Sequence, residues 1–375
     1  MERGQYVWLI FTVIIISAVF LLADRVESSQ STVDVIVTIH LLGGLMPKVL
    51  VIGSNSFSGQ DFIDLMLDDQ DREVIGVSRS PEKADLFLRY RARPGTSKYR
   101  FQRFDLNVDM PDFLKFLDAE KPDQIVNFAA QGEVGPSWNH PEHWFQTNCV
   151  ALAQMVKHLS ERSYLKRYLH ISSPEVYGSC EGVITESATP NPSTPYAASK
   201  AAADMLLETF AAHKGFPLLT VRATNVYGAR QQLFKIMMRA PIYIRLGRKI
   251  PLHGGGHAVK SYIHIRDVSR GERSILENGQ MGKIYHLSPD HGVSVRDLVA
   301  TIARRMGKLF SEVVEDVEER LGQDAVYEIN SSLVRDTLGW HPEVSLEHGV
   351  DEVVEWIDRH WETIKLLPHD YIHIP

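Results

Sequence analysis

Residues 49–59 read VLVIGSNSFSG, an apolar run followed by a loop that has a glycine at each end. The β-branched residues of the run are typical of a buried strand, and the apolar spacing of residues 60–67 indicates a helix after the loop. A strand, a tight glycine turn and a helix N-terminus together can bind a pyrophosphate. The stretch therefore predicts a dinucleotide-binding loop, although an ordinary strand–helix turn has the same local pattern.

The loop itself indicates which residues would approach the phosphates. Gly53 would provide the tight turn, and Gly59 would let the helix pack close to the sheet. Ser56 stands where a third glycine is usual, and a serine fits there if its φ stays negative. The loop residues expected at the cofactor are Gly53, Ser56, Phe57, Ser58 and Gly59.

Patterns of strand and helix alternate along the chain from residue 48 onward. The expected strands are 49–52, 73–77, 123–128, 167–171 and 217–221, and the expected helices are 60–67, 113–117, 151–159 and 197–212. This alternation predicts an α/β fold with a doubly wound parallel sheet of the Rossmann type.

The alternation ends near residue 225, where loops and helices such as 295–306 and 346–364 take over. We therefore expect residues 46–224 to form a dinucleotide-binding Rossmann domain and residues 225–375 to form mainly a smaller, substrate-binding domain. Residues 261–277 are expected to return to the Rossmann domain.

The first 45 residues differ from the rest of the chain. Residues 6–23 form an uncharged, mostly apolar run that is just long enough to cross a bilayer. Three interpretations remain open: a single-pass anchor of undetermined orientation, a secretory signal without a clear cleavage site, or an extension upstream of a true start at Met46. We expect the rest of the chain to be cytoplasmic, with membrane contact only if this run is a real anchor.

The composition excludes several classes of function. The chain has 40 Lys+Arg and 47 Asp+Glu, a net charge of −7, and lacks the basic excess that broad nucleic-acid binding needs. Two cysteines, Cys149 and Cys180, cannot build a disulfide framework and favour a reducing compartment. His253 and His257 are separated by three glycines, which indicate a loop rather than a helix face, and no metal site is expected.

The ends of the predicted strands bear on the choice of cofactor. Residues 76–80 (GVSRS) hold no acid that could bind the ribose 2′-hydroxyl of NAD, whereas Arg79, beside Ser78, could pair with the 2′-phosphate of NADP. We therefore favour NADP, with a solvated loop cation as the alternative role of Arg79. Asp105 and Leu106 end the next strand, where an aspartate can reach the adenine amino group.

A second group of residues has the chemistry of a catalytic site. Tyr196 and Lys200 are four residues apart at the start of a predicted helix, so both lie on one helix face. A nearby ammonium lowers the pKa of a phenol, and Tyr196 could then act as a base near neutral pH. Ser173 and Glu175 follow the strand at 167–171, at the edge of the sheet where ligands bind. A turn residue and a solvated or capping acid are their alternative roles.

Taken in order, these motifs resemble the extended short-chain dehydrogenases/reductases, the NAD-dependent epimerase/dehydratase family. The motifs are GSNSFSG at 53–59, Asp105-Leu106, NFAAQ at 127–131, SSPEVYG at 172–178, Tyr196-x3-Lys200, RATNVYG at 222–228, YIHIRDV at 262–268 and LGWHP at 338–342. Within the family, the chain is most similar to nucleotide-sugar 4,6-dehydratases, such as the dTDP-glucose and GDP-mannose enzymes. The Ala129-Ala130-Gln131 segment and Arg79 resemble the GDP-mannose enzymes.

The resemblance implies a reaction cycle on an NDP-hexose with a tightly bound, recycled NAD(P)+. Tyr196 would remove the 4-hydroxyl proton while hydride leaves C4, with Lys200 holding the cofactor ribose and Ser173 orienting the hydroxyl. Glu175 would then take the C5 proton, water would leave from C6, and the hydride would return to C6. The product would be a 4-keto-6-deoxy sugar nucleotide.

The resemblance also assigns binding residues. It places Ala129 and Ala130 at the cofactor, and our candidates for substrate binding are Gln131, Asn225, Lys235, Lys260 and Arg320.

Two positions depart from the family pattern. Pro174 stands where dTDP-glucose dehydratases commonly have a proton-donating Asp, and Lys260 stands where an Arg is frequent, so a bidentate contact to the diphosphate is lost.

Several alternatives remain open at this point. A nucleotide-sugar 4-epimerase needs Tyr196 and Lys200 but no base for C5, whereas UDP-glucuronate decarboxylases also carry a glutamate at the Glu175 position. A 4-keto reductase and a non-catalytic NAD(P)-binding sensor are further alternatives.

Relatives pair as homodimers through the helices near 147–160 and 197–212. The second helix carries small residues that would allow close approach: Ala197, Ala198, Ala201, Ala202 and Ala203.

Overall fold

The computed structural model describes residues 47–69, 71–92, 98–179, 182–318 and 328–374. All of them belong to one compact unit, Pro47–Pro375. The apolar run at 6–23, Cys180 and Arg320 lie outside the described residues. None of the helices in these ranges has the length and hydropathy needed to span a bilayer.

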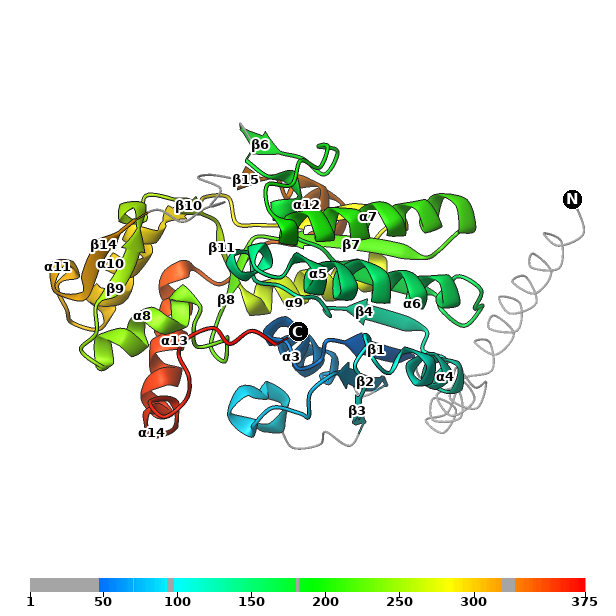
Figure 1. Ribbon diagram of the computed structural model, residues 1–375, viewed down its shortest axis with the longest axis horizontal. Helices are drawn as coiled ribbons and strands as arrows, with labels where there is room; N and C mark the ends of the chain where they lie inside the picture. Colours follow the sequence, from blue (N-terminus) through cyan, green and yellow to red (C-terminus); the bar gives the residue numbers. More distant parts are fainter. Residues whose placement is uncertain (1–46, 70, 93–97, 180–181, 319–327, 375) are drawn as a thin grey trace, which may run out of the picture. The chain divides into compact units, whose positions relative to one another are not determined.

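A sheet of seven strands lies at the centre of this unit, in the order β12-β7-β5-β4-β1-β2-β3 (Figure 1). Every neighbouring pair of strands in the sheet is parallel. The strands are β1 (Lys48–Ile52), β2 (Glu73–Ser78), β3 (Tyr99–Arg103), β4 (Gln124–Asn127), β5 (Arg167–Ile171), β7 (Leu218–Ala223) and β12 (Ile284–Leu287). The α/β, doubly wound fold predicted from the sequence is confirmed.

The strand order reverses between β1 and β4, which pair directly with Ile52 opposite Asn127. From β1 the chain builds outward through β2 and β3, and from β4 it builds the other way through β5 and β7. Ligands of doubly wound sheets bind at the carboxyl ends of the strands at such a reversal. The loops that begin at Gly53 and Phe128 therefore face the expected ligand site.

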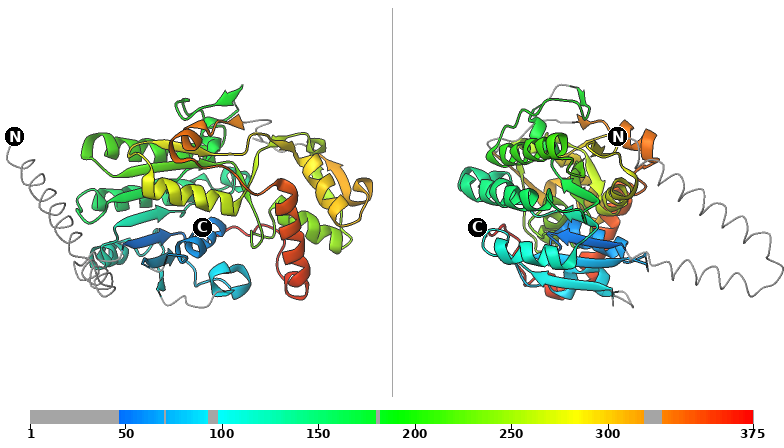
Figure 2. Two further views of the ribbon diagram at one scale, coloured as in Figure 1. Left: turned by 180° about the vertical axis from the view of Figure 1, so that it is seen from behind. Right: turned by 90° about the vertical axis from the view of Figure 1, so that its right-hand side faces the viewer.

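Helices cover both faces of the sheet because its central strands are apolar on both sides. Val49 and Val51 of β1 join one core, and Leu50 and Ile52 join the opposite core. The helices of the first layer are α3 (Phe57–Met66), α9 (Ile265–Asn278) and α12 (Ser332–Leu338), and those of the second are α4 (Met110–Glu120), α6 (Leu152–Leu159) and α7 (Pro195–Lys214). Figure 2 shows the two layers from other sides.

A separate apolar core lies beside the sheet, built from residues between Tyr227 and Ile364. Its main elements are α8 (Ile236–Arg245), β9 (Ile250–His253), α10 (Val295–Arg305), α11 (Phe310–Val313), β14 (Val314–Val317), α13 (Leu346–Arg359) and α14 (Trp361–Ile364). The remaining elements are short: β6 (Val183–Ile184), β8 (Asn225–Tyr227), β10 (Val259–Lys260), β11 (Tyr262–His264), β13 (Val293–Ser294), β15 (Glu328–Ile329), α5 (Pro141–Phe145), the 3-10 helices η1 (Asp85–Phe87), η2 (Arg89–Ala92), η3 (Gly135–Trp138), η5 (Pro174–Tyr177) and η6 (Gly254–Gly256), and the π-helix η4 (Gln146–Ala151).

The structure departs from the sequence-based expectations in several places. Strand β12 was not expected from the sequence and lies beyond the expected domain boundary at 224. The helix expected at 346–364 ends at Arg359, and α14 begins at Trp361. The expectation that five alanines of α7 form a surface of small residues is wrong in part. Ala197, Ala201 and Ala203 are buried within the chain.

Candidate active site

A cavity of about 510 Å³ opens at the carboxyl ends of β1, β2 and β4. Several residues expected at the cofactor line it, from separate loops: Gly53, Ser56, Ser78, Arg79, Asp105, Leu106, Ala129 and Ala130. Gln131, expected at the substrate, lines this cavity instead, and its Nε2 donates a hydrogen bond to the Ile374 carbonyl at 2.8 Å.

The loop between β1 and α3 is packed closely at both of its glycines. Gly53 has a φ of +82°, and a Cβ atom there would lie 2.6 Å from the Ala129 nitrogen. A Cβ atom on Gly59 would lie 2.6 Å from the Gly53 oxygen. Ser56 keeps the required negative φ, −68°, and caps α3 by accepting a hydrogen bond from Gly59 N at 3.0 Å. A close backbone turn that leads into a helix N-terminus is what a dinucleotide pyrophosphate needs, so these residues fit an NAD(P) cofactor.

Three cations line the same cavity: Arg79, Lys83 and Arg103. Arg103 Nε donates to the Arg79 carbonyl at 2.8 Å, and Arg79 Nη2 donates to the Ile374 carbonyl at 3.2 Å. Burial lowers the pKa of Lys83. Lys83 and Arg103 were missed in the sequence. The strand expected to end at Asp105 and Leu106 ends at Arg103 instead, so these two residues lie in the loop that follows β3.

A second cavity, of about 330 Å³, adjoins the first and shares Ser56 and Phe128 with it. Residues expected at the cofactor, the reaction and the substrate meet there: Phe57, Ser58, Glu175, Tyr196, Asn225 and Lys235. The adjoining cavities would bring a bound cofactor and a substrate into contact.

Capping fixes the start of α7 and therefore the position of Tyr196. Thr194 caps the helix with its side chain, and Pro195 occupies the first turn, where no N–H donor is needed. Lys200, one turn further along, is 2% exposed, and its Nζ donates a hydrogen bond to the Ile171 carbonyl at 2.7 Å. The Lys200 side chain therefore joins α7 to the end of β5.

The 3-10 turn η5 holds Ser173 and Glu175 together. Ser173 Oγ accepts a hydrogen bond from Glu175 N at 3.4 Å and is also hydrogen-bonded to the Glu175 carboxylate. Pro174, between them, is buried and carries no proton that it could donate. A carboxylate and a tyrosine hydroxyl thus line one cavity, with a serine bonded to the carboxylate.

The electrostatics at Tyr196 run against the sequence-based expectation. Burial raises the pKa of Tyr196, the Glu175 carboxylate raises it further, and a hydrogen bond with Ser173 acts in the opposite direction. Burial also lowers the pKa of Lys200 to about 8, which weakens the charge that was expected to lower the pKa of the phenol. The expected lowering is therefore wrong for the polypeptide by itself, because residue spacing carries no information on burial.

A buried network behind Lys200 was missed in the sequence. Asp204, one turn after Lys200, accepts a hydrogen bond from Ser172 Oγ at 2.6 Å and pairs with Arg222 at 2.7 Å. Asp204 raises the pKa of Lys200 against the larger effect of burial. The spacing of Tyr196, Lys200 and Asp204, each four residues from the next on α7, was the signal that would have revealed it.

The expected substrate residues are only partly brought together. Asn225 lines the second cavity from β8, and Lys235 lines it while forming an ion pair with Glu133 at 2.7 Å. Lys260 lies on β10 and is not among the residues that line either cavity. Arg320 lies outside the described residues.

The chain is similar to known proteins over most of its length. The family model described as GDP-mannose 4,6 dehydratase matches residues 50–353. A dTDP-glucose 4,6-dehydratase of Streptomyces niveus is 29% identical over 328 residues, which cover 85% of this chain and 96% of the relative. A trifunctional UDP-glucose 4,6-dehydratase of Arabidopsis thaliana is 27% identical over 281 residues, 72% of this chain and 42% of that relative.

Solved structures share the fold. A dTDP-glucose 4,6-dehydratase of Streptomyces venezuelae, solved with NAD bound, superposes with a TM-score of 0.78 at 27% identity and covers 84% of this chain and 98% of that one. A UDP-glucuronic acid 4-epimerase of Bacillus cereus gives a TM-score of 0.76 at 22% identity, covering 83% and 99%, a likeness of fold alone. The same fold therefore occurs in enzymes with two different reactions, so the residues of the site, and not the fold, determine the reaction.

Proposed function

The chain belongs to the GDP-mannose 4,6 dehydratase family of extended short-chain dehydrogenases/reductases, and from this premise we propose that it is an NAD(P)-dependent nucleotide-sugar 4,6-dehydratase. It would convert an NDP-hexose into an NDP-4-keto-6-deoxyhexose with the loss of one water. The observation that carries the proposal is Glu175, which lines the same cavity as Tyr196 and is hydrogen-bonded to Ser173. A 4-epimerase needs no such second base.

The first half of the reaction would use α7. Tyr196 would take the proton of the sugar 4-hydroxyl as C4 is oxidised, Ser173 would orient that hydroxyl, and Lys200 would hold the cofactor ribose. Asp204 helps to keep Lys200 protonated for this role. When bound, the oxidised nicotinamide would accept the C4 hydride and return it to C6, and its positive charge would oppose the rise in the Tyr196 pKa.

The second half of the reaction would depend on Glu175. The 4-ketone acidifies the C5 proton, which Glu175 would remove. Because Pro174 has no proton to donate, Glu175 would return the same proton to the C6 hydroxyl, which leaves as water. When the hydride returns to C6, a proton is added at C5. This proton equals in number the one that Tyr196 removed from the 4-hydroxyl, so the only net loss is one water.

We also propose NADP as the preferred cofactor. The end of β2 carries Ser78 and Arg79 with no acid, and Lys83 and Arg103 line the same cavity. A guanidinium can bind a phosphate through two charge-assisted hydrogen bonds, whereas an uncharged ribose hydroxyl gains little from it. The Streptomyces venezuelae relative was solved with NAD. The proposed preference for NADP in this chain rests on the three cations that line its cavity.

A homodimer is proposed from apolar side chains that the chain leaves exposed on neighbouring helices. Met205 on α7 is 62% exposed, and Val150 on η4 is 44% exposed. The two helices contact each other within the chain. Exposed apolar residues on adjacent elements are typical of a protein–protein interface.

Mass analysis after incubation with a panel of sugar nucleotides tests the proposed reaction. GDP-mannose, dTDP-glucose, UDP-glucose and CDP-glucose would each be supplied with the purified protein. Loss of one water from one substrate is expected, and Glu175→Gln should abolish it while cofactor binding stays intact. Glu208→Gln, an exposed carboxylate further along α7, is the matched control. If the product has the mass of the substrate but NMR shows an altered sugar, the result would contradict the dehydratase proposal and support a 4-epimerase.

A further inference from the structure

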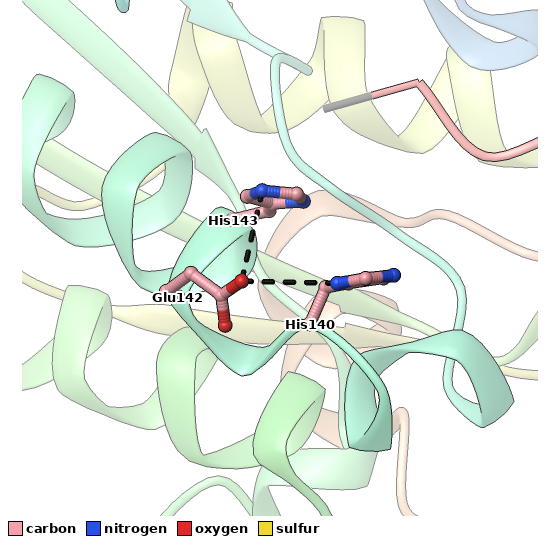
Figure 3. Close-up of side chains that lie close together, drawn as sticks. All are labelled: His140, Glu142 and His143. Atoms are coloured by element: carbon pink, nitrogen blue, oxygen red, sulfur yellow. Dashed lines mark ion pairs between the residues drawn. The ribbon is translucent and has the colours of Figure 1, made fainter.

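Three histidines gather in a cluster, and none of them lines either cavity. His140 directly precedes α5, His143 lies within it, and His373 comes from the C-terminal tail, 230 residues beyond His143. Glu142 lies between the first two and points toward both (Figure 3). No metal site was expected from the sequence, because no Cys/His cluster has a zinc-type spacing. The close spacing of His140, Glu142 and His143 was not singled out there.

The donor atoms of three of these residues converge on one point. Glu142 Oε1 lies 3.8 Å from His140 Nδ1 and 3.7 Å from His143 Nε2 (Figure 3). All three donor atoms lie within 4.8 Å of one another. In a tetrahedral zinc site with metal–nitrogen bonds of about 2.0–2.1 Å, neighbouring donors are about 3.4 Å apart. Small side-chain rotations would bring the three groups to that spacing.

The other nitrogen of His143 is held by the C-terminal tail. His143 Nδ1 is 2.9 Å from His373 Nε2, and the His373 Nδ1 atom is 3.0 Å from the Tyr371 hydroxyl. The His373 ring is also fixed by stacking on the buried Trp144, with centroids 5.3 Å apart and planes 6° apart. A metal-bound histidine commonly donates its second N–H to such a partner, which fixes the tautomer and the ring orientation.

We propose that His140 Nδ1, a Glu142 oxygen and His143 Nε2 bind one divalent transition-metal ion, with zinc as the reference ion. Two imidazoles and one carboxylate suit zinc and similar ions better than magnesium or calcium, which prefer oxygen ligands alone. His373 acts as a positioning residue: by accepting from His143 Nδ1–H it leaves Nε2 of His143 unprotonated and directed at the ion.

This site would be linked to the cofactor cavity through the tail. Ile374, the neighbour of His373, lines that cavity, and its carbonyl accepts hydrogen bonds from Gln131 at 2.8 Å and Arg79 at 3.2 Å. Figure 1 shows the tail running back from α14 toward the sheet. Metal binding would strengthen the bond between His143 and His373 and so hold the tail against the cavity.

Zinc titration of the full chain tests the site. The protein would carry no histidine tag, would be treated with a chelator, and would compete with a chromophoric zinc indicator. One zinc per chain is expected, and His140→Ala or His143→Ala should weaken binding at least about ten-fold. His213→Ala, an exposed histidine on α7, should bind zinc as the wild type does. Equal affinity of the wild type and His143→Ala would overturn the site.

The role of the tail has its own readout. His373→Phe keeps a ring that can stack on Trp144 but removes the nitrogen that faces His143, so zinc affinity should fall about ten-fold. Zinc should also slow carboxypeptidase digestion of the tail in the wild type and not in His373→Phe. Equal zinc affinity in both proteins would overturn the positioning role of His373. Thermal melts of each variant establish that it is folded, and His143→Gln replaces His143→Ala if the latter is not.

Discussion

Asp204 Oδ2 lies 2.7 Å from Arg222 Nη2, and neither side chain is more than 2% exposed. Asp204 also accepts a hydrogen bond from Ser172, the neighbour of Ser173. The network therefore ties α7, which carries Lys200, to β7 and to the loop that follows β5. Removing either charge would leave the other buried without its partner.

Asp204→Asn should lower the free energy of unfolding by about 3–5 kcal/mol, because Arg222 stays charged in a dry environment. Urea denaturation followed by tryptophan fluorescence measures the loss. Asp112→Asn is the control, since Asp112 is 73% exposed and pairs with the exposed Lys115, and it should change stability by less than about 1 kcal/mol. Equal stability of Asp204→Asn and the wild type would contradict a structural role for the pair.

His286 should make the protein less stable in acid. Its ring is fully buried, with Nε2 2.7 Å from the Tyr177 hydroxyl and Nδ1 3.0 Å from the Asn330 carbonyl. Burial lowers the pKa of His286 from 6.5 to about 3, and Arg222 contributes in the same direction. The unfolded chain binds a proton that the folded chain excludes, so the free energy of unfolding should fall as the pH drops from about 6.5 to about 3.

The slope of stability against pH measures this effect. His286 alone should contribute about 1.4 kcal/mol per pH unit within that window. His286→Gln should reduce the slope by that amount, whatever it does to the stability itself, and His213→Gln, at an exposed histidine, should leave the slope unchanged. A slope that His286→Gln does not alter would rule out His286 as the titrating group.

Arg79→Ala should weaken the binding of NADP by about 10–100-fold and leave that of NAD nearly unchanged, because only NADP offers a phosphate to the guanidinium. Fluorescence titration with the reduced forms of both cofactors gives the two affinities. Arg100→Ala is a suitable control, since Arg100 is paired with Glu73 and Glu120 outside the cavity. An equal loss for both cofactors would argue against recognition of the 2′-phosphate by Arg79.

Met205→Glu should convert a dimer into monomers, because a buried carboxylate would stand opposite the apolar surface of the partner. Light scattering after size-exclusion chromatography measures the mass of the particle. Leu366→Glu changes another exposed apolar residue, 79% exposed and away from α7, and should leave the mass unchanged. A wild-type protein that remains monomeric at high concentration would contradict the proposed dimer interface.

Local patterning was enough to predict most of the sheet and the glycine loop. The strand expected at 167–171 has the bounds of β5, and Ser56 has the negative φ that its place in the loop required. These features depend on a few consecutive residues, whose apolar spacing and turn chemistry can be read directly. The pairing of Tyr196 with Lys200 on one helix face follows in the same way.

Features that depend on tertiary neighbours could not be predicted. The direction of the Tyr196 pKa shift is set by burial and by Glu175, which the spacing to Lys200 does not describe. Asp204 and Arg222 meet across two elements, and His373 reaches His143 from 230 residues away. In each case the chemistry depends on a distance between segments that the linear order of residues leaves undetermined.

Strand β12 has a consequence for the order in which the molecule can be made. It completes the sheet beside β7, and α9 covers one face of that sheet, so residues up to 287 are needed before the sheet is finished. A nascent chain that has emerged only as far as residue 224 would present an unpaired strand edge and an uncovered apolar face. Folding of this unit on the ribosome would thus have to wait for the second half of the chain, and a fragment ending at 224 would be prone to aggregation.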